Sequence, residues 1–171
     1  MAFYFGADDP KTHPLLQVRP REFTADRLNA LAESGVTILH GHIRPRALLT
    51  ACPDPGQYYV WLREPIEQTL SHYHFLLGLE PRGGGLREAV GGSGMPLERF
   101  LKLPEVADFQ SRFIDPLPIT EAGFVGVTEL FSQMLPLLGL KGTDGRSNAN
   151  PDKPLAGEAE RRTILPYVSR D

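Results

Sequence analysis

The segment that most constrains the fold is residues 57–77, which read QYYVWLREPIEQTLSHYHFLL. Residues 57–62 are apolar on both faces, which is typical of a central strand in a parallel sheet. Pro65 then stands at the first position of a helix, where proline is preferred, and we expect that helix to run to about Leu79. A strand that passes directly into a helix is the repeating unit of α/β folds, so this segment predicts an α/β protein.

The residues before this segment predict the same class. Residues 23–35, FTADRLNALAESG, indicate a helix that Thr24 caps at its start and Gly35 at its end. Residues 36–43, VTILHGHI, indicate a short strand because β-branched residues are frequent there. Residues 46–51 indicate one or two helical turns. The order helix, strand, helix, strand, helix predicts a central parallel sheet flanked by helices.

The remaining elements are predicted from weaker signals. Residues 81–95 are rich in glycine and predict a flexible loop. Residues 96–114 predict a helix that is broken at its internal proline. Residues 123–129 predict a third short strand, and residues 130–140 a helix after it. The rest of the chain, residues 141–171, predicts a polar, loop-rich tail.

Composition excludes several classes of protein. The chain has 171 residues, which suits one domain, and its 41% hydrophobic and 23% charged content predicts a packed core. A net charge of −3 gives no basic excess, so we expect no nucleic-acid partner. No apolar run is long enough to span a membrane and no signal peptide is recognised, so we expect a cytoplasmic protein. Cys52, the only cysteine, cannot form an internal disulfide.

The turn after the strand at 57–62 carries a candidate phosphate site. Ligands of α/β proteins bind at the carboxyl edge of the sheet, where a helix N-terminus offers free N–H groups. Arg63 adds a positive charge there, and Ser71 lies two helical turns further on, so its hydroxyl can face the same side. The alternative is an exposed Arg63 paired with Glu64 or Glu67, and a serine on a helix face.

A pair of histidines forms a second candidate site. His40 and His42 lie two residues apart on a predicted strand, so both side chains point to the same face. Such a pair suits two metal ligands, or a general base with a supporting neighbour. A hydrogen-bonded pair at a strand end is the structural alternative. His72 and His74 have the same spacing on a predicted helix, where their side chains point apart.

Three segments, in this order, resemble the Golgi-type carbohydrate sulfotransferase family, close to the heparan sulfate and uronyl 2-O-sulfotransferases and their bacterial relatives. Residues 38–43, ILHGHI, resemble the family's His-Gly-His segment. Residues 58–77 resemble its 3′-phosphate-binding element, with Glu64 where the family usually has Asp. Residues 123–140 resemble its Val-Gly-Val-Thr-Glu segment and the helix that follows. The resemblance covers about residues 36–140.

The resemblance implies a P-loop-NTPase-like sulfotransferase fold and a donor, 3′-phosphoadenosine 5′-phosphosulfate. The sulfuryl group would pass to a hydroxyl, most naturally of a carbohydrate, and no metal is implied. Arg63 and Ser71 would bind the 3′-phosphate of the donor. His42 would remove the acceptor proton, and His40 would assist or orient it. The chemistry agrees, because in-line transfer of a sulfuryl group needs positioned cations and a base on the attacking hydroxyl.

The family's first strand and Pro-Lys-Thr-Gly-type loop, which hold the 5′-phosphosulfate, have no clear counterpart. Lys11, in the PKT sequence, is one candidate for the loop lysine, although no glycine follows it. Alternatively, this segment corresponds to sequence that lies after the loop in relatives. We therefore expect a domain incomplete at its N-terminus, with its transfer activity in question. Arg146 and Lys153 would close over the donor, or they are solvated loop charges.

Other functions remain open at this point. Within the single domain 1–171, the closest alternative is a catalytically inactive sulfotransferase-fold protein that binds a nucleotide or a partner. A metal-dependent hydrolase using His40 and His42 would need a third ligand, for which Asp54 and His13 are the candidates. A P-loop kinase is disfavoured because the chain lacks a GxxxxGK[ST] sequence.

Overall fold

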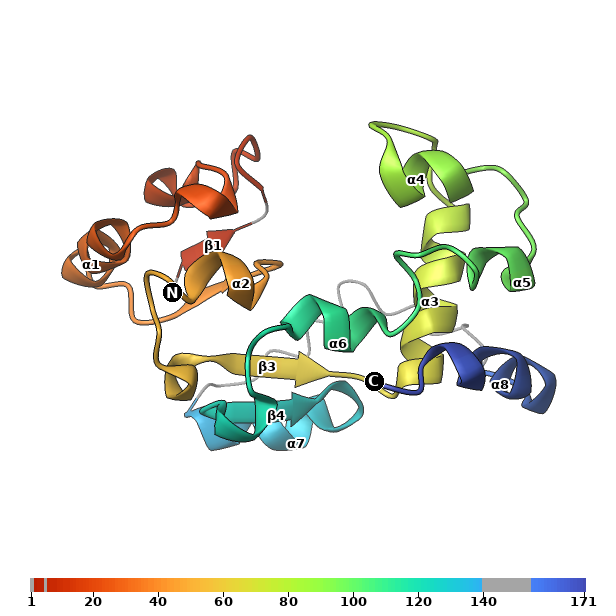
Figure 1. Ribbon diagram of the computed structural model, residues 1–171. Coiled ribbons are helices and arrows are strands. Elements are labelled where there is room, and N and C mark those ends of the chain that lie inside the picture. Colours follow the sequence, from red (N-terminus) through yellow and green to blue (C-terminus); the bar gives the residue numbers. More distant parts are fainter. Residues whose placement is uncertain (1, 5, 140–154) are drawn as a thin grey trace. The chain divides into compact units, whose positions relative to one another are not determined.

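The computed structural model describes residues 2–4, 6–139 and 155–171 (Figure 1). Helices and short parallel strand pairs are both present, which confirms the α/β class at a coarse level. The sequence predicts one domain, whereas the structure groups the residues into two compact units. Unit 1 consists of Met1–Val60 and Phe113–Val125, and unit 2 of Trp61–Arg112 and Gly126–Asp171.

The regular elements are short, and α3 is the longest of those described. The helices are α1 Ala25–Glu33, α2 Pro45–Leu48, α3 Pro65–Leu77, α4 Gly85–Val90, α5 Leu97–Phe100, α6 Phe109–Ile114, α7 Phe131–Met134 and α8 Glu158–Ile164. The strands are β1 Ala2–Tyr4, β2 Leu39–Gly41, β3 Tyr59–Leu62 and β4 Phe124–Val127. Turns of 3-10 helix connect several of them, including Pro14–Leu16 and Leu135–Leu138.

In unit 1, β1 and β2 pair in parallel, with Phe3 opposite His40 and Tyr4 opposite Gly41. Ala2 and Tyr4 are buried and Phe3 is exposed, as expected for a strand with one covered face. A Cβ atom on Gly41 would lie 2.5 Å from the carbonyl oxygen of Tyr4. The glycine between the two histidines therefore permits the close approach of β1.

The second strand pair joins β3 and β4. The carbonyl of Tyr58 accepts a hydrogen bond from the N–H of Phe124, and the carbonyl of Leu62 accepts one from the Thr128 hydroxyl. Both contacts join residues 66 positions apart, so the strands run parallel, as their arrows show in Figure 1. Among the described residues this sheet has two strands. The interpretation of β3 as a central strand is therefore wrong: Tyr59 is 55% exposed.

The core of unit 1 forms around β1. Its buried hydrophobic residues are Ala2, Tyr4, Leu16, Phe23, Leu31 and Ile43. The start of α1 agrees with the prediction, because Thr24 accepts a hydrogen bond from the N–H of Arg27. The helix ends one residue earlier than predicted, at a cap formed by Ser34, and Gly35 follows with a φ of +85°.

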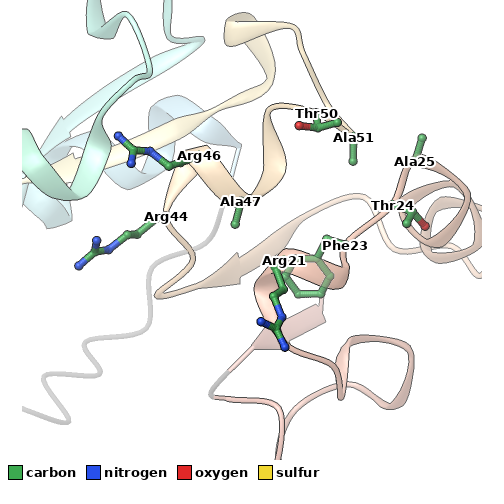
Figure 2. Close-up of a pocket in the computed structure, with 9 residues that line it drawn as sticks. All are labelled: Arg21, Phe23, Thr24, Ala25, Arg44, Arg46, Ala47, Thr50 and Ala51. Atoms are coloured by element: carbon green, nitrogen blue, oxygen red, sulfur yellow. The ribbon is translucent and has the colours of Figure 1, made fainter.

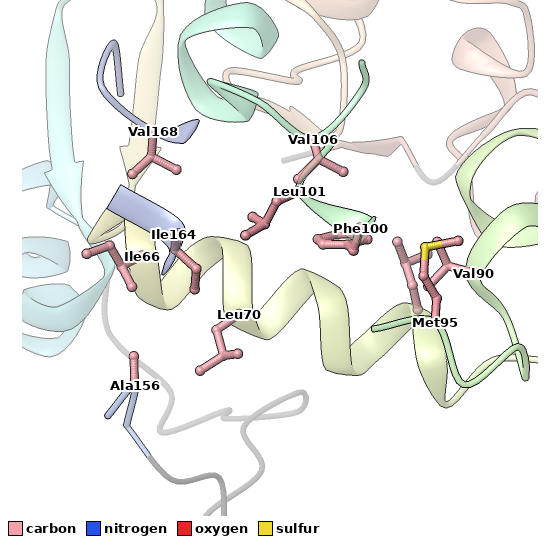
Figure 3. Packing of buried hydrophobic residues seen from close by; sticks show 11 residues of the cluster. Ile66, Leu70, Val90, Met95, Phe100, Leu101, Val106, Ala156, Ile164 and Val168 are labelled. Atoms are coloured by element: carbon pink, nitrogen blue, oxygen red, sulfur yellow. The ribbon is translucent and has the colours of Figure 1, made fainter. Parts of the chain in front are cut away.

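The core of unit 2 forms along α3 (Figure 3). This helix begins at Pro65, as predicted, and ends two residues before the predicted Leu79. Its apolar residues Ile66, Leu70 and Tyr73 recur at helical spacing and so share one face. The buried members of the core are Ile66, Leu70, Leu76, Val90, Met95, Phe100, Leu101, Val106, Ala156, Ile164 and Val168.

The glycine-rich segment and the tail differ from their predictions. The segment 81–95, predicted as a loop, contains α4, because three glycines with positive φ turn the chain and Val90 is then fully buried. The tail 141–171, predicted to be polar and loop-rich, contains α8 in its described part, and Ile164 anchors this helix in the core.

Three further predictions of length need correction. Of the strand expected at 36–43, three residues pair with the three residues of β1 in the part of the chain that the structure describes. Residues 96–114 form two short helices, α5 and α6, on either side of Pro104; the break is as predicted, but it is longer and extends over residues 101–108. The helix expected at 130–140 is shortened to α7, since Pro136 follows it in a 3-10 turn. No helix in the described part of the chain has the length and apolarity needed to cross a membrane.

Candidate functional site

The turn between β3 and α3 carries Arg63. Side chains that are distant in the sequence form hydrogen bonds with the main chain of this turn. Gln110 accepts a hydrogen bond from the Arg63 N–H at 2.8 Å and donates one to the Arg63 carbonyl at 2.9 Å. One side-chain amide thus satisfies both main-chain groups of Arg63, as a neighbouring strand would. Glu129 accepts a hydrogen bond from the N–H of Glu64 at 3.2 Å. The main chain at the candidate phosphate site is therefore held on two sides.

The position of Gln110 is itself fixed by the last residue of the chain. The Asp171 carboxylate accepts hydrogen bonds from the N–H groups of Gln110 and Ser111, at 3.1 and 2.7 Å. It therefore occupies the free N–H groups at the start of α6, as a capping residue does. In the same region, the N–H of Arg170 donates to the Asp108 carboxylate at 3.0 Å.

The guanidinium group of Arg63 lies in an ion pair. Its Nε is 3.5 Å from Oε1 of Glu129, and the Arg63 side chain is 30% exposed. The structural alternative named Glu64 or Glu67 as the partner, and the structure brings Glu129 there instead. That partner is distant in sequence, so local spacing could not identify it. Glu129 does, however, belong to the segment 123–140 that carries part of the family resemblance.

The N-terminus of α3 is occupied by a second group of charges. The Glu64 carboxylate accepts a hydrogen bond from the N–H of Glu67 at 2.7 Å and so caps the helix. The side chain of Glu67 is 7% exposed and accepts hydrogen bonds from Arg161 and from the N–H of Ala156, both at 2.9 Å. Arg161 also lies 3.6 Å from Glu64. One of the helix N–H groups expected to bind a phosphate is therefore already used.

These contacts define the charge of the site. The carboxylates of Glu64, Glu67 and Glu129 lie in ion pairs with the guanidinium groups of Arg63 and Arg161. Among the described residues of this site, three negative groups face two positive ones, which by itself disfavours the binding of a phosphate. The Glu129 carboxylate pairs with the Nε of Arg63, so it would compete with a phosphate for this guanidinium group.

Ser71 lies on α3, where it is half-buried. Its hydroxyl makes no hydrogen bond with any residue that the structure describes. The next residue, His72, packs against the rings of Phe100 and Phe109, with centroids 6.0 and 5.0 Å away. Burial lowers the pKa of His72 below its ordinary value of 6.5. The environment of His72 therefore favours the neutral imidazole.

The predicted catalytic histidines lie in unit 1, at the end of β2. His40 and His42 are both exposed, and the His40 ring lies 5.6 Å from the ring of Phe3 in an edge-to-face contact. Both imidazoles are therefore accessible to an acceptor hydroxyl. Arg63 and Ser71 belong to unit 2.

The candidate donor loop folds back onto β1. The N–H of His13 donates to the Phe3 carbonyl at 3.0 Å, and the N–H of Lys11 donates to the Asp9 carboxylate at 2.8 Å. The side chain of Lys11 is exposed, and the chain then enters the 3-10 turn Pro14–Leu16. A loop that cradles phosphate would instead lead into a helix N-terminus.

The remaining candidates are accounted for as follows. Arg146 and Lys153 lie outside the described residues. Within the described ranges, no group of three or more His, Cys, Asp or Glu residues could hold a metal ion. His13 and Asp54, the candidate third ligands of a hydrolase, accept hydrogen bonds from nearby main-chain N–H groups and so stabilise turns.

Comparisons of this chain with family models, with curated proteins and with solved structures found no match. The residues that sequence reasoning missed are Gln110, Glu129, Asp171 and Arg161. Each contacts the β3–α3 turn or its support from at least 47 positions away along the chain. Only Glu129 had a signal, because it lies in a segment already singled out.

Proposed function

We propose that this chain is a sulfotransferase-type protein with the P-loop-NTPase-like fold. It would transfer a sulfuryl group from 3′-phosphoadenosine 5′-phosphosulfate to a hydroxyl, in the first instance of a carbohydrate. The observation that carries the proposal is a contact between two of the three segments that resemble the family. Glu129 of the Val-Gly-Val-Thr-Glu segment contacts both Arg63 and the N–H of Glu64 in the phosphate-binding element.

In this proposal the residues have separate roles. Arg63 and Ser71 bind the 3′-phosphate of the donor, and Gln110 fixes the main chain from which the Arg63 side chain extends. His42 accepts the proton of the acceptor hydroxyl, and His40 orients His42. The fit to the donor is partial: a cation is present for the 3′-phosphate, and the loop of Lys11 does not form a cradle for the 5′-phosphosulfate.

This partial fit favours a second candidate, a protein of the same fold that binds a nucleotide without transferring a sulfuryl group. The specific observation is the fold of the loop after β1, where the His13 N–H is bonded to the Phe3 carbonyl and no α-helix follows directly. Lys11 would then have no part in binding, while Arg63 and Ser71 would keep theirs.

Calorimetry with adenosine 3′,5′-bisphosphate tests the binding site that both candidates share. Replacing Arg63 by alanine removes a charge-assisted contact and should cost about 1.5–3 kcal/mol of binding free energy. Arg162→Ala is the control, since this exposed arginine of α8 pairs only with Glu158 among the described residues. Equal affinity for adenosine 5′-monophosphate, or equal loss in both variants, would show that no 3′-phosphate site exists.

The ion pair offers a sharper test of the same site. Glu129→Gln removes the competing charge and keeps an oxygen that can accept from the Glu64 N–H. Affinity for adenosine 3′,5′-bisphosphate should therefore rise in this variant, whereas it falls in Arg63→Ala. A fall in both variants would mean that Glu129 is needed to hold the arginine, and the role assigned to the ion pair would be wrong.

Transfer of radiolabelled sulfate to a panel of glycans separates the two candidates. If the chain transfers, His42→Ala should slow the reaction about 10²–10⁴-fold, because the general base is lost, while nucleotide affinity stays unchanged. His40→Ala should cost less. Binding without transfer in the unmodified chain would favour the nucleotide-binding protein, and full activity of His42→Ala would overturn the assignment of the base.

A further inference from the structure

A cavity of about 620 Å³ lies within unit 1, and its residues take no part in the function proposed above (Figure 2). Its lining comes from two stretches of chain. One covers residues 21–25, at the start of α1, and the other covers residues 44–51, which include α2. Its volume lies in the range of sites that bind small organic molecules.

The two ends of this cavity differ in chemistry. In Figure 2, the ring of Phe23 and the methyl group of Ala47 lie near the centre; the side chains of Arg44 and Arg46 extend to the left, and the guanidinium group of Arg21 lies below Phe23. Small apolar or hydroxyl-bearing residues, among them Thr50, lie to the other side. The lining contains three arginines and no acidic residue. The cavity therefore has a cationic end and an uncharged end.

The positive charge at the cationic end is only partly compensated. Arg46 pairs with Asp115, and Arg21 lies 4.0 Å from Glu22, but all four side chains are at least 49% exposed. Exposed ion pairs of this kind contribute little and exchange partners readily. The guanidinium group of Arg44 makes no hydrogen bond or ion pair with any residue that the structure describes. It is therefore the cation most readily available to a ligand.

The floor of the cavity is formed by a packed aromatic ring. Phe23 is 5% exposed, belongs to the buried core of unit 1, and has its ring 5.6 Å from that of Tyr4 in an edge-to-face contact. A ligand that rests on this ring meets a surface already fixed by packing, so it loses less binding free energy to ordering the protein.

We propose that this cavity binds a small organic phosphate or sulfate ester with an apolar or aromatic body. The anionic group would lie between Arg44 and Arg46, whose planar guanidinium groups match the geometry of oxyanions. The apolar body would lie against Phe23 and Ala47. We expect both parts of the ligand to contribute to its affinity, because the arginines would contact only the anionic group and Phe23 and Ala47 only the apolar body.

Titration of the whole chain with phenyl phosphate, followed by NMR or calorimetry, tests this proposal. Benzyl alcohol, which lacks the charge, and inorganic phosphate, which lacks the ring, are the matched probes. We expect phenyl phosphate to bind with a dissociation constant at or below the millimolar range, and each matched probe to bind at least about 10-fold more weakly. Binding should weaken as salt is added.

Three variants locate the site. Arg44→Gln should weaken binding of phenyl phosphate about 10-fold or more, through loss of a charge-assisted contact. Thr50→Trp should block the uncharged end without changing any charge. Arg19→Gln is the control, because Arg19 is an exposed arginine of the same unit and does not line the cavity. Thermal unfolding of each variant shows whether it is folded, and a folded Thr50→Trp variant that binds normally would overturn the proposal.

Other results would also overturn it. These are no binding of phenyl phosphate, equal binding of inorganic phosphate, or equal weakening by Arg19→Gln and Arg44→Gln. A phosphate ester can also be a lipid head group, and sedimentation with phosphatidylcholine vesicles, with and without phosphatidic acid, distinguishes this source. Recruitment that depends on phosphatidic acid and on Arg44 would support the same chemistry with a lipid as the ligand.

Discussion

The chain contains two strand-to-helix junctions that begin alike and end differently. In residues 39–48, β2 leads through Arg44 to Pro45, the first residue of α2. In residues 59–77, β3 leads through Arg63 to Pro65, the first residue of α3. Both helices therefore begin with the residue type that favours a helix start. Yet α2 has 4 residues and α3 has 13.

The difference lies in what each helix contacts. Glu64 caps α3 with its carboxylate, whereas Arg44 provides no side-chain cap for α2. Ile66, Leu70 and Leu76 of α3 are buried, so this helix supplies one side of a whole core. The comparison shows that proline determines where a helix begins, and that the burial of its face determines how far it extends.

The largest expected effect comes from removing that burial. Leu70 is 1% exposed in the core of unit 2, so Leu70→Ala should lower the free energy of unfolding by about 2–5 kcal/mol. Leu48 of α2 is only half-buried, and Leu48→Ala should cost about 1 kcal/mol. Urea unfolding followed by circular dichroism measures both. Equal losses would show that the two helices depend on their cores alike.

The next effect concerns the turn before α3, which has no counterpart before α2. Gln110→Ala leaves the N–H and the carbonyl of Arg63 without their partner and should cost about 1–3 kcal/mol. Gln133→Ala, on an exposed position of α7, is the control and should cost less than about 0.5 kcal/mol. Thermal unfolding measures the loss. If the two variants lost equal stability, the hydrogen bonds between Gln110 and the main chain of Arg63 would contribute nothing measurable to it.

A smaller effect should separate the two helix caps. Glu64→Ala removes a carboxylate that accepts from the Glu67 N–H, and should cost about 1 kcal/mol. Arg44→Ala removes no cap, and its effect on stability should stay within about 0.5 kcal/mol. Both variants are compared by urea unfolding at low and high salt. A larger loss in Arg44→Ala would contradict the difference drawn between the junctions.

The smallest expected effect is a pH dependence of the free energy of unfolding, which His72 of α3 should cause. Burial lowers the pKa of His72 in the folded state below 6.5, so the unfolded chain takes up a proton first as the pH falls. The stability due to neutral His72 is complete above pH 6.5 and declines below it, until the pH passes the folded pKa.

The variant His72→Leu isolates the contribution of His72 to the pH dependence of stability. His72→Leu removes the titrating group and keeps an apolar side chain against Phe100 and Phe109. Between about pH 7.5 and about pH 5.5, the original chain should lose stability relative to the variant. A gain in relative stability on acidification would mean that protonated His72 has an unrecognised partner in the folded state.

Local sequence signals predicted the parts of the fold that depend on neighbouring residues. The starts of α1 at Thr24 and of α3 at Pro65 follow from capping and from the fixed φ of proline. The length of β2 and the formation of α8 depend on partners far along the chain, namely β1 and the core around Leu70. No local pattern contains that information.

In the candidate site too, adjacent residues predicted one part and distant residues determine the other. The position of Arg63 at a strand-to-helix turn could be predicted from adjacent residues. Its contacts could not: Gln110 and Glu129 come from 47 and 66 positions further along the chain. The sequence therefore indicated a cation, and the structure shows that the Glu129 carboxylate pairs with it.

The division into two units has a consequence for synthesis on the ribosome. The chain passes from unit 1 to unit 2 after Val60, returns at Phe113, and leaves again after Val125. Unit 1 thus lacks its final piece until most of the protein has emerged, and by then the first part of unit 2 is already exposed. Unit 1 is complete in sequence only at Val125, so its last step of folding must take place while residues 61–112 of unit 2 are already exposed, unlike that of a domain formed from one continuous stretch of chain.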